Sequence, residues 1–134
     1  MIYLLDTNVC VMYLNGRSES VQNRILSVPT KDIAVCSVVK AELFYGAMRS
    51  NNPTRTLQKQ QAFLEHYISL PFNDEAAAIF GNIRAQLTAQ GTPIGGYDLQ
   101  IAAIALTNNL TLVTHNTREF SRIPELKLED WENV

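Results

Sequence analysis

The first eight residues of the chain, Met1-Ile-Tyr-Leu-Leu-Asp-Thr-Asn8, decide the fold that we expect. Ile2 to Leu5 is a continuous apolar run that is too short for a helix and suits a strand buried on both faces of a sheet. The run stops at a carboxylate, Asp6, and apolar residues with looser spacing resume at Val9. An open α/β sheet begins in this way, and its ligands bind outside the carboxyl ends of the strands. The stretch therefore predicts a functional group, Asp6, at that edge.

The rest of the chain alternates apolar runs with amphipathic segments. Further strands are expected at residues 33–37, 68–72, 110–114 and 126–128, and Pro71 indicates that the run at 68–72 lies near a sheet edge. Helices are expected up to about residue 16 and at 21–28, 38–48, 54–66, 74–90 and 97–108, with Ser37 as an N-cap and Gly91 just past a helix end. This alternation predicts an α/β fold in three layers, a parallel sheet flanked by helices. The length predicts one domain, residues 1–134.

Composition and charge narrow the class of protein. Apolar residues make up 46% of the chain and charged residues 18%, which is typical of a globular protein. The net charge of −2 gives no global signature of a nucleic-acid binder, although a local basic rim would not appear in the sum. Cys10 and Cys36 lack metal-ligand spacing, so we expect two buried, inert thiols. No signal peptide or membrane span is recognised, which predicts a cytoplasmic protein without a membrane partner.

Four polar residues follow the predicted strands or open the helices that pack there. Asp6 ends the first strand, Glu42 lies one turn into the helix after the second, Asp98 opens a strongly apolar helix, and Asn116 follows the last long strand. Each has a structural alternative. Asp6 suits an N-cap, Asp98 complements a helix dipole, and Asn116 suits a turn. Glu42 is flanked by apolar residues, and a half-buried carboxylate needs a partner or a cation.

Taken together, these residues predict a metal site. Three carboxylates in one crevice would repel one another unless a cation neutralised them. Oxygen ligands without thiolates or paired imidazoles favour Mg²⁺ or Mn²⁺ over Zn²⁺. Such an ion can activate water and stabilise charge on a phosphate, so hydrolysis of a phosphodiester is the leading hypothesis. The chain has no phosphate-binding glycine motif, and no acidic partner two residues after Asp6, which disfavours nucleotide-binding and phosphoaspartate enzymes.

Four segments carry a resemblance to a known family. They are Leu-Leu-Asp-Thr-Asn at 4–8, Ser-Val-Val-Lys-Ala-Glu-Leu-Phe-Tyr-Gly at 37–46, Pro-Ile-Gly-Gly-Tyr-Asp-Leu-Gln-Ile-Ala-Ala at 93–103 and Leu-Val-Thr-His-Asn-Thr-Arg-Glu-Phe at 112–120. In this order the chain resembles PIN-domain ribonucleases, specifically the VapC-type toxins of type II toxin–antitoxin systems. The resemblance covers essentially the full length.

The resemblance implies an endoribonuclease that uses Mg²⁺, with Mn²⁺ as the alternative. It implies that Asp6 and Asp98 are the main metal ligands, that Glu42 completes the acidic set and that Asn116 helps to place water or substrate. Thr7 and Asn8 match a polar pair that would orient Asp6 or a water. Glu119 is an open position, either part of the site or a solvated helix charge.

The resemblance also implies partners. It implies a cognate antitoxin whose tail covers the active-site groove, and a homodimer or a toxin–antitoxin hetero-oligomer. Four side chains are considered for such a contact, with core packing as the alternative for at least half of them: Tyr13, Phe44, Tyr45 and Met48. Two other functions stay open, a non-catalytic PIN-like module that binds a partner or RNA, and a metal-dependent phosphatase acting on small molecules.

Overall fold

A five-stranded sheet forms the centre of the computed structural model, which describes residues 1–132. The strands are β1 (Tyr3–Leu5), β2 (Ile33–Cys36), β3 (Ile68–Leu70), β4 (Thr111–Val113) and β5 (Leu128–Glu129). Their order across the sheet is β3-β2-β1-β4-β5, and every neighbouring pair is parallel. The predicted parallel sheet is therefore confirmed, and β3, the strand followed by Pro71, lies at an edge as expected.

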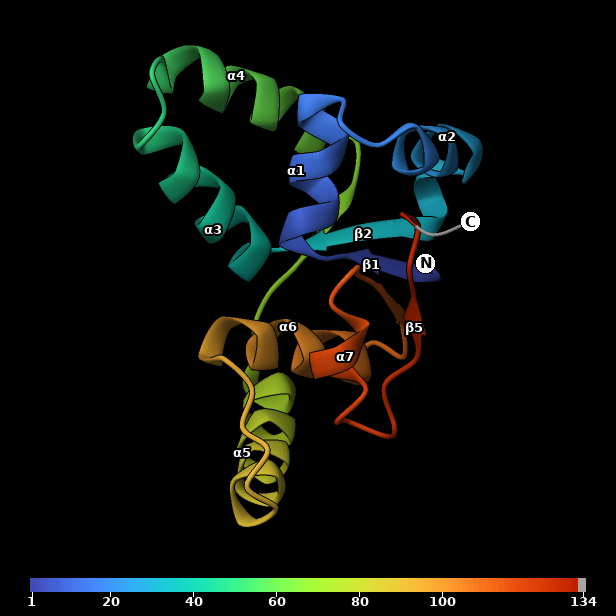
Figure 1. Ribbon diagram of the computed structural model, residues 1–134, viewed down its shortest axis with the longest axis vertical. Helices are drawn as coiled ribbons and strands as arrows, with labels where there is room; N and C mark the ends of the chain where they lie inside the picture. Colours follow the sequence, from blue (N-terminus) through green and yellow to red (C-terminus); the bar gives the residue numbers. More distant parts are fainter. Residues whose placement is uncertain (133–134) are drawn as a thin grey trace.

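Helices cover both faces of this sheet. In Figure 1, α1, α2, α3 and α4 lie above the sheet, and α5, α6 and α7 lie below it. Their bounds are α1 (Thr7–Asn15), α2 (Glu19–Ser27), α3 (Ser37–Met48), α4 (Pro53–Leu64), α5 (Asp74–Ala89), α6 (Gly96–Thr107) and α7 (Thr117–Phe120), with a 3₁₀ turn η1 (Thr30–Asp32) before β2. The three-layer arrangement follows from the alternation of elements in the sequence.

Most differences from the sequence prediction lie at element ends. Ser37 was expected to cap α3, but Cys36 holds the extended N-cap position and Ser37 is already helical. The predicted strand at 33–37 is shorter for the same reason, because the helix starts directly after β2. Two short elements, η1 and α7, were not predicted, since a single turn has no readable periodicity. Gly91 follows α5 with a φ of 73°, as expected for a C′ glycine.

The core is apolar on both faces of the sheet. Leu4 and Leu5 are fully buried in β1, and α6 is buried nearly all round, as its composition predicted. Cys10 and Cys36 are free and buried, and burial raises the pKa of both thiols, that of Cys36 to about 11. The prediction of two inert thiols agrees with this, because an un-ionised thiol is a poor nucleophile.

Of the four side chains considered for a partner contact, two are partly buried and two are exposed. Tyr13 and Phe44 are partly buried against the core, and the Tyr13 ring stacks on Phe63. Tyr45 and Met48 are exposed on α3. Within residues 1–132, none of the helices combines the length and the apolar character needed to cross a membrane.

The strand order determines where a ligand can bind. The chain moves from β1 through β2 to β3 on one side, and then returns to place β4 on the other side of β1. Such a reversal opens a crevice at the carboxyl ends of the two strands that flank it, here β1 and β4. Helices α1, α3 and α6 all begin at this edge of the sheet (Figure 1).

Candidate active site

Asp6 lies at the reversal point, directly after β1. It is only 3% exposed, and each carboxylate oxygen accepts a hydrogen bond. The backbone N–H of Thr7 donates to Oδ1 over 2.7 Å, and the hydroxyl of Thr114, at the end of β4, donates to Oδ2 over 2.8 Å. Asp6 is thus the N-cap of α1, which was the structural alternative, and it also faces the crevice between β1 and β4. The two roles coexist.

Glu42 reaches the same region from α3. It is partly buried, and its Oε1 accepts a hydrogen bond of 2.6 Å from the hydroxyl of Thr7. Thr7 therefore contacts two carboxylates, Asp6 through its backbone N–H and Glu42 through its side chain. This residue was predicted only to orient Asp6 or a water, and the contact with Glu42 was not foreseen.

Asp98 opens α6 on the opposite side of the sheet from α3. Its pKa is raised to about 6, first by burial and then by the negative charges of Asp6, Glu42 and Glu119. The pKa of Asp6 is raised as well, mainly by burial, with a smaller contribution from Glu42. Because charges influence one another in this way only at short range, the structure brings the three predicted carboxylates together.

Asn116 joins the group from the segment after β4. Its backbone N–H donates to the Thr114 hydroxyl over 3.0 Å, and its side-chain Nδ2 donates to Glu119 Oε2 over 2.6 Å. Glu119 therefore belongs to the same network and is not a solvated helix charge. Thr114 links Asp6 and Asn116, and sequence reasoning missed it because a threonine at a strand end carries no distinctive signal.

The donor set fits a hard divalent cation. The ligand atoms that Asp6, Glu42, Asp98 and Asn116 offer are oxygens, and neighbouring negative charges raise the pKa of Asp6 and Asp98 in a way that bound positive charge would relieve. The ligand atoms of Asp6, Glu42 and Asp98 do not all lie within 4.8 Å of one another. Within residues 1–132, the one group of three His, Cys, Asp or Glu side chains that meets this limit is His115, Asp130 and Glu132, which begins one residue before Asn116. His115 Nδ1 lies 3.0 Å from Asp130 Oδ2, the distance of an ion pair.

Two hollows each have one residue of the candidate site in their lining. The first, which we call the tyrosine hollow, has a volume of about 480 Å³ and is lined by Thr7, Ala41, Glu42, Tyr45, Arg49 and Tyr97. The second, of about 370 Å³, is lined by Asn8, Val11, Met12, His115, Asn116 and Glu132. The first hollow therefore borders Glu42 and the second borders Asn116.

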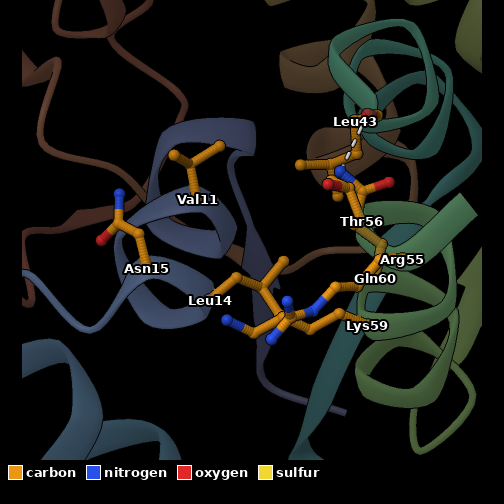
Figure 2. Close-up of a pocket in the computed structure, with 8 residues that line it drawn as sticks. All are labelled: Val11, Leu14, Asn15, Leu43, Arg55, Thr56, Lys59 and Gln60. Carbon is orange, nitrogen blue, oxygen red and sulfur yellow. Dashed lines mark hydrogen bonds between the residues drawn. The ribbon is translucent and has the colours of Figure 1, made fainter. Parts of the chain in front are cut away.

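A third hollow lies away from the carboxylates, between α1 and α4. It has a volume of about 480 Å³, and Figure 2 shows Val11, Leu14 and Asn15 of α1 on one side and the residues of α4 on the other. Gln60 of α4 is buried at its wall and donates from Nε2 to the Leu43 carbonyl over 2.9 Å, while its Oε1 has no hydrogen-bond partner. A buried acceptor without a hydrogen-bond partner destabilises the fold, so a ligand or partner that donates to it would be stabilised there.

Comparison with known sequences is consistent with this architecture. Residues 3–126 match the family model described as PIN domain. The chain is 40% identical over 133 residues to "Ribonuclease VapC2" of Rickettsia felis, an alignment that covers 98% of this chain and 99% of the relative. It is 38% identical over 129 residues to "tRNA(fMet)-specific endonuclease VapC" of Salmonella typhimurium, covering 96% of this chain and 97% of the relative.

Solved structures give the same relationship. A crystal structure of VapBC2 from Rickettsia felis bound to a promoter DNA fragment contains a chain that matches with a TM-score of 0.90 and 39% identity, covering 98% of this chain and 99% of that one. The DNA-bound VapBC complex of Salmonella typhimurium matches with a TM-score of 0.92 and 37% identity, over 98% of both chains.

Proposed function

The chain belongs to the PIN domain family, and from that membership we propose that it is a metal-dependent endoribonuclease, the toxin of a toxin–antitoxin pair. One observation carries the proposal. Asp6, Glu42 and Asp98 arrive from three different elements and meet at the edge where β1 and β4 diverge. The relatives are named as a ribonuclease and a tRNA-specific endonuclease, which supports cleavage of RNA as the reaction.

Each residue of the site has a distinct role in this proposal. Asp6 and Asp98 hold a Mg²⁺ or Mn²⁺ ion, and Glu42 completes the acidic set. Bound there, the ion would supply activation of water and stabilisation of negative charge on the phosphate. The hydrogen bond that Asn116 Nδ2 donates to Glu119 holds the amide in place, and in this proposal the side-chain oxygen helps to place water or substrate.

The polar residues around the carboxylates keep them in place. The hydroxyls of Thr114 and Thr7 hold Asp6 and Glu42 by hydrogen bonds of 2.8 Å and 2.6 Å. Each hydroxyl donates to one oxygen of its carboxylate and leaves the other oxygen to the crevice or to a backbone contact. Such supporting bonds fix the orientation of ligands and tune their basicity.

The antitoxin is the proposed protein partner, since the solved relatives are VapBC complexes. We assign the docking of an apolar antitoxin segment to the hollow between α1 and α4 (Figure 2), and the tail that covers the active-site groove stays a prediction from the family resemblance. Val11 and Leu14 offer an apolar wall, Arg55 and Lys59 a basic rim, and the Gln60 Oε1 an unfilled acceptor. An apolar antitoxin segment that carries acidic residues and one hydrogen-bond donor would match the wall, the rim and the acceptor. We also propose that the chain forms a homodimer and that it acts in the cytoplasm, where RNA is found.

An activity assay separates the three candidate functions. Purified chain, freed of antitoxin under denaturing conditions and refolded, is incubated with Mg²⁺ and either transfer RNA or p-nitrophenyl phosphate. The proposal expects discrete RNA fragments from wild type, none from Asp6→Asn, and no release of p-nitrophenol. Hydrolysis of the small ester would favour the phosphatase, and RNA binding without cleavage would favour the non-catalytic module.

A further inference from the structure

Exposed tyrosines gather at one place on this protein. All five tyrosines lie within residues 1–132, and two of them, Tyr45 and Tyr97, are exposed, at 64% and 61% of their surface, and line the tyrosine hollow. The other three are partly buried. A scattered exposed aromatic needs no explanation, but two that share one hollow with a candidate active-site carboxylate, Glu42, indicate a binding surface.

The two rings come from different elements that both carry site residues. Ala41, Tyr45 and Arg49 follow one another at intervals of four residues, so they form one stripe along α3, one residue away from Glu42. Tyr97 stands on α6 immediately before Asp98. The hollow between them therefore has one candidate carboxylate, Glu42, in its lining, and its other wall is formed by the residue that precedes Asp98.

Positive charge is also present in the hollow. The Arg49 guanidinium lies over the Tyr45 ring, 4.6 Å from its centroid, and Tyr45 still keeps 64% of its surface exposed. A cation over an aromatic ring holds both groups in a defined orientation. The hollow thus combines two aromatic rings, one cation and the hydrogen-bonded pair Thr7 and Glu42.

We propose that Tyr45 and Tyr97 bind an unstacked RNA base next to the phosphodiester that is cut, and that Arg49 contacts a neighbouring phosphate. This inference rests on the proposed ribonuclease function. Aromatic side chains bind single-stranded RNA by stacking, which tolerates any base because every base has a π face. The volume of about 480 Å³ is within the range of about 300–1,000 Å³ that small-ligand sites occupy.

The proposal defines the form of the substrate. A base in a regular duplex is already stacked on its neighbours and cannot enter the hollow, whereas a base in a single strand or loop can. The chain therefore selects RNA by whether a base next to the cut is free. A second copy of the chain is the competing occupant, since Met48 is also exposed on α3.

Binding can be measured without cleavage. The probe is a fluorescein-labelled, unstructured 12-nucleotide RNA, offered single-stranded or annealed to its complement. Its fluorescence anisotropy is followed in the presence of Mg²⁺, and all proteins carry Asp98→Asn so that the RNA is not cleaved. Tyr45→Ala and Tyr97→Ala should each weaken single-strand binding about 5- to 150-fold, the range for loss of one stacked base. Tyr45→Phe and Tyr97→Phe should retain binding, because they keep the ring. Arg17→Ala and Leu26→Ala, at exposed positions outside the hollow, serve as controls.

Three further readouts make the result unambiguous. Circular dichroism reports whether each variant folds, and light scattering reports its mass. With the catalytic Asp98 restored, the alanine variants should raise KM more than they lower kcat, because the contact is made in the bound state as well as in the transition state.

The outcomes separate this inference from the function it rests on. Wild-type cleavage with unchanged RNA affinity in both alanine variants would overturn the stacking role and leave the ribonuclease proposal standing. A change in mass without a change in affinity would assign the tyrosines to self-association instead. Equal affinity of wild type for duplex and single strand would also overturn the inference. If folded wild type neither binds nor cleaves RNA, the ribonuclease proposal itself is contradicted.

Discussion

The Thr114 hydroxyl donates a hydrogen bond of 2.8 Å to Asp6, which joins the ends of β4 and β1 at the point where the sheet order reverses. This bond opposes the effect of burial, because it lowers the pKa of Asp6 while burial raises it. It therefore helps to keep a carboxylate that is 3% exposed in its charged form.

Replacement of Thr114 should impair the site without loss of the fold. Thr114→Val keeps the shape of the side chain and removes the donor, so we expect cleavage or apparent Mg²⁺ affinity to fall about 10- to 100-fold, as for other residues that support metal ligands. Thr114→Ser, which restores the hydroxyl, is the matched control. Wild-type rates and Mg²⁺ dependence in Thr114→Val would show that this bond is dispensable.

Glu119 should influence Asp98 through its charge. Glu119→Gln removes one of the negative charges that raise the pKa of Asp98 to about 6, while a glutamine oxygen can still accept from Asn116 Nδ2. We expect the pKa of Asp98 to move down toward its ordinary value of 3.8, measured by carbon NMR of the labelled carboxyl. An unchanged Asp98 titration in this variant would place Glu119 outside the electrostatic site.

The stability of the metal-free protein should depend on pH in a defined direction. The pKa of Asp98 is about 6 in the fold against an ordinary value of 3.8, so between these values the folded state binds more protons than the unfolded state. The free energy of unfolding should therefore fall as pH rises through this window. Asp6, whose pKa is also raised, acts in the same direction.

Thermal melts in EDTA measure this effect. Wild type should lose Tm as pH rises from about 4 to about 7, and Asp98→Asn should lose less because only Asp6 then contributes. Added Mg²⁺ should restore Tm at neutral pH in wild type more than in Asp98→Asn. Parallel pH curves for the two proteins in EDTA would contradict the assignment of the raised pKa to Asp98.

The α1–α4 hollow should be required for the antitoxin and not for the fold. Val11 is 40% exposed at its wall, so Val11→Glu adds a charge to an apolar contact surface without disturbing the core. We expect the co-expressed antitoxin complex to weaken at least about tenfold, since a buried unpaired charge is costly. Leu26→Glu, at an exposed position outside this hollow, is the control. Equal affinity of both variants would move the docking site elsewhere.

The main features of the fold could be predicted because they depend on patterns that recur along the chain. Leu4–Leu5 and α6 are apolar on every side, so the sequence alone indicates that both segments are buried. The exact ends of α3 and the single turn α7 could not be predicted, because they depend on where the backbone leaves the sheet.

The candidate site was predictable only in part. Asp6, Glu42 and Asp98 could be named because a carboxylate among apolar residues at a strand or helix end is chemically conspicuous. The contacts of Thr7 with Glu42 and of Thr114 with Asp6 span 35 and 108 residues, and only the folded sheet brings these side chains together. The same holds for Tyr45 and Tyr97, whose shared hollow depends on the packing of α3 near α6.

A single cleavage gel can show whether these carboxylates cleave RNA with a divalent cation. Antitoxin-free wild type and Asp98→Asn, both shown to be folded by circular dichroism, are incubated with end-labelled transfer RNA in EDTA and in EDTA followed by excess Mg²⁺. We expect discrete fragments from wild type only after Mg²⁺ is restored, and none from Asp98→Asn under either condition. Metal-dependent cleavage by Asp98→Asn at the wild-type rate, or cleavage by wild type in EDTA, would show that these carboxylates do not form a metal-dependent ribonuclease site.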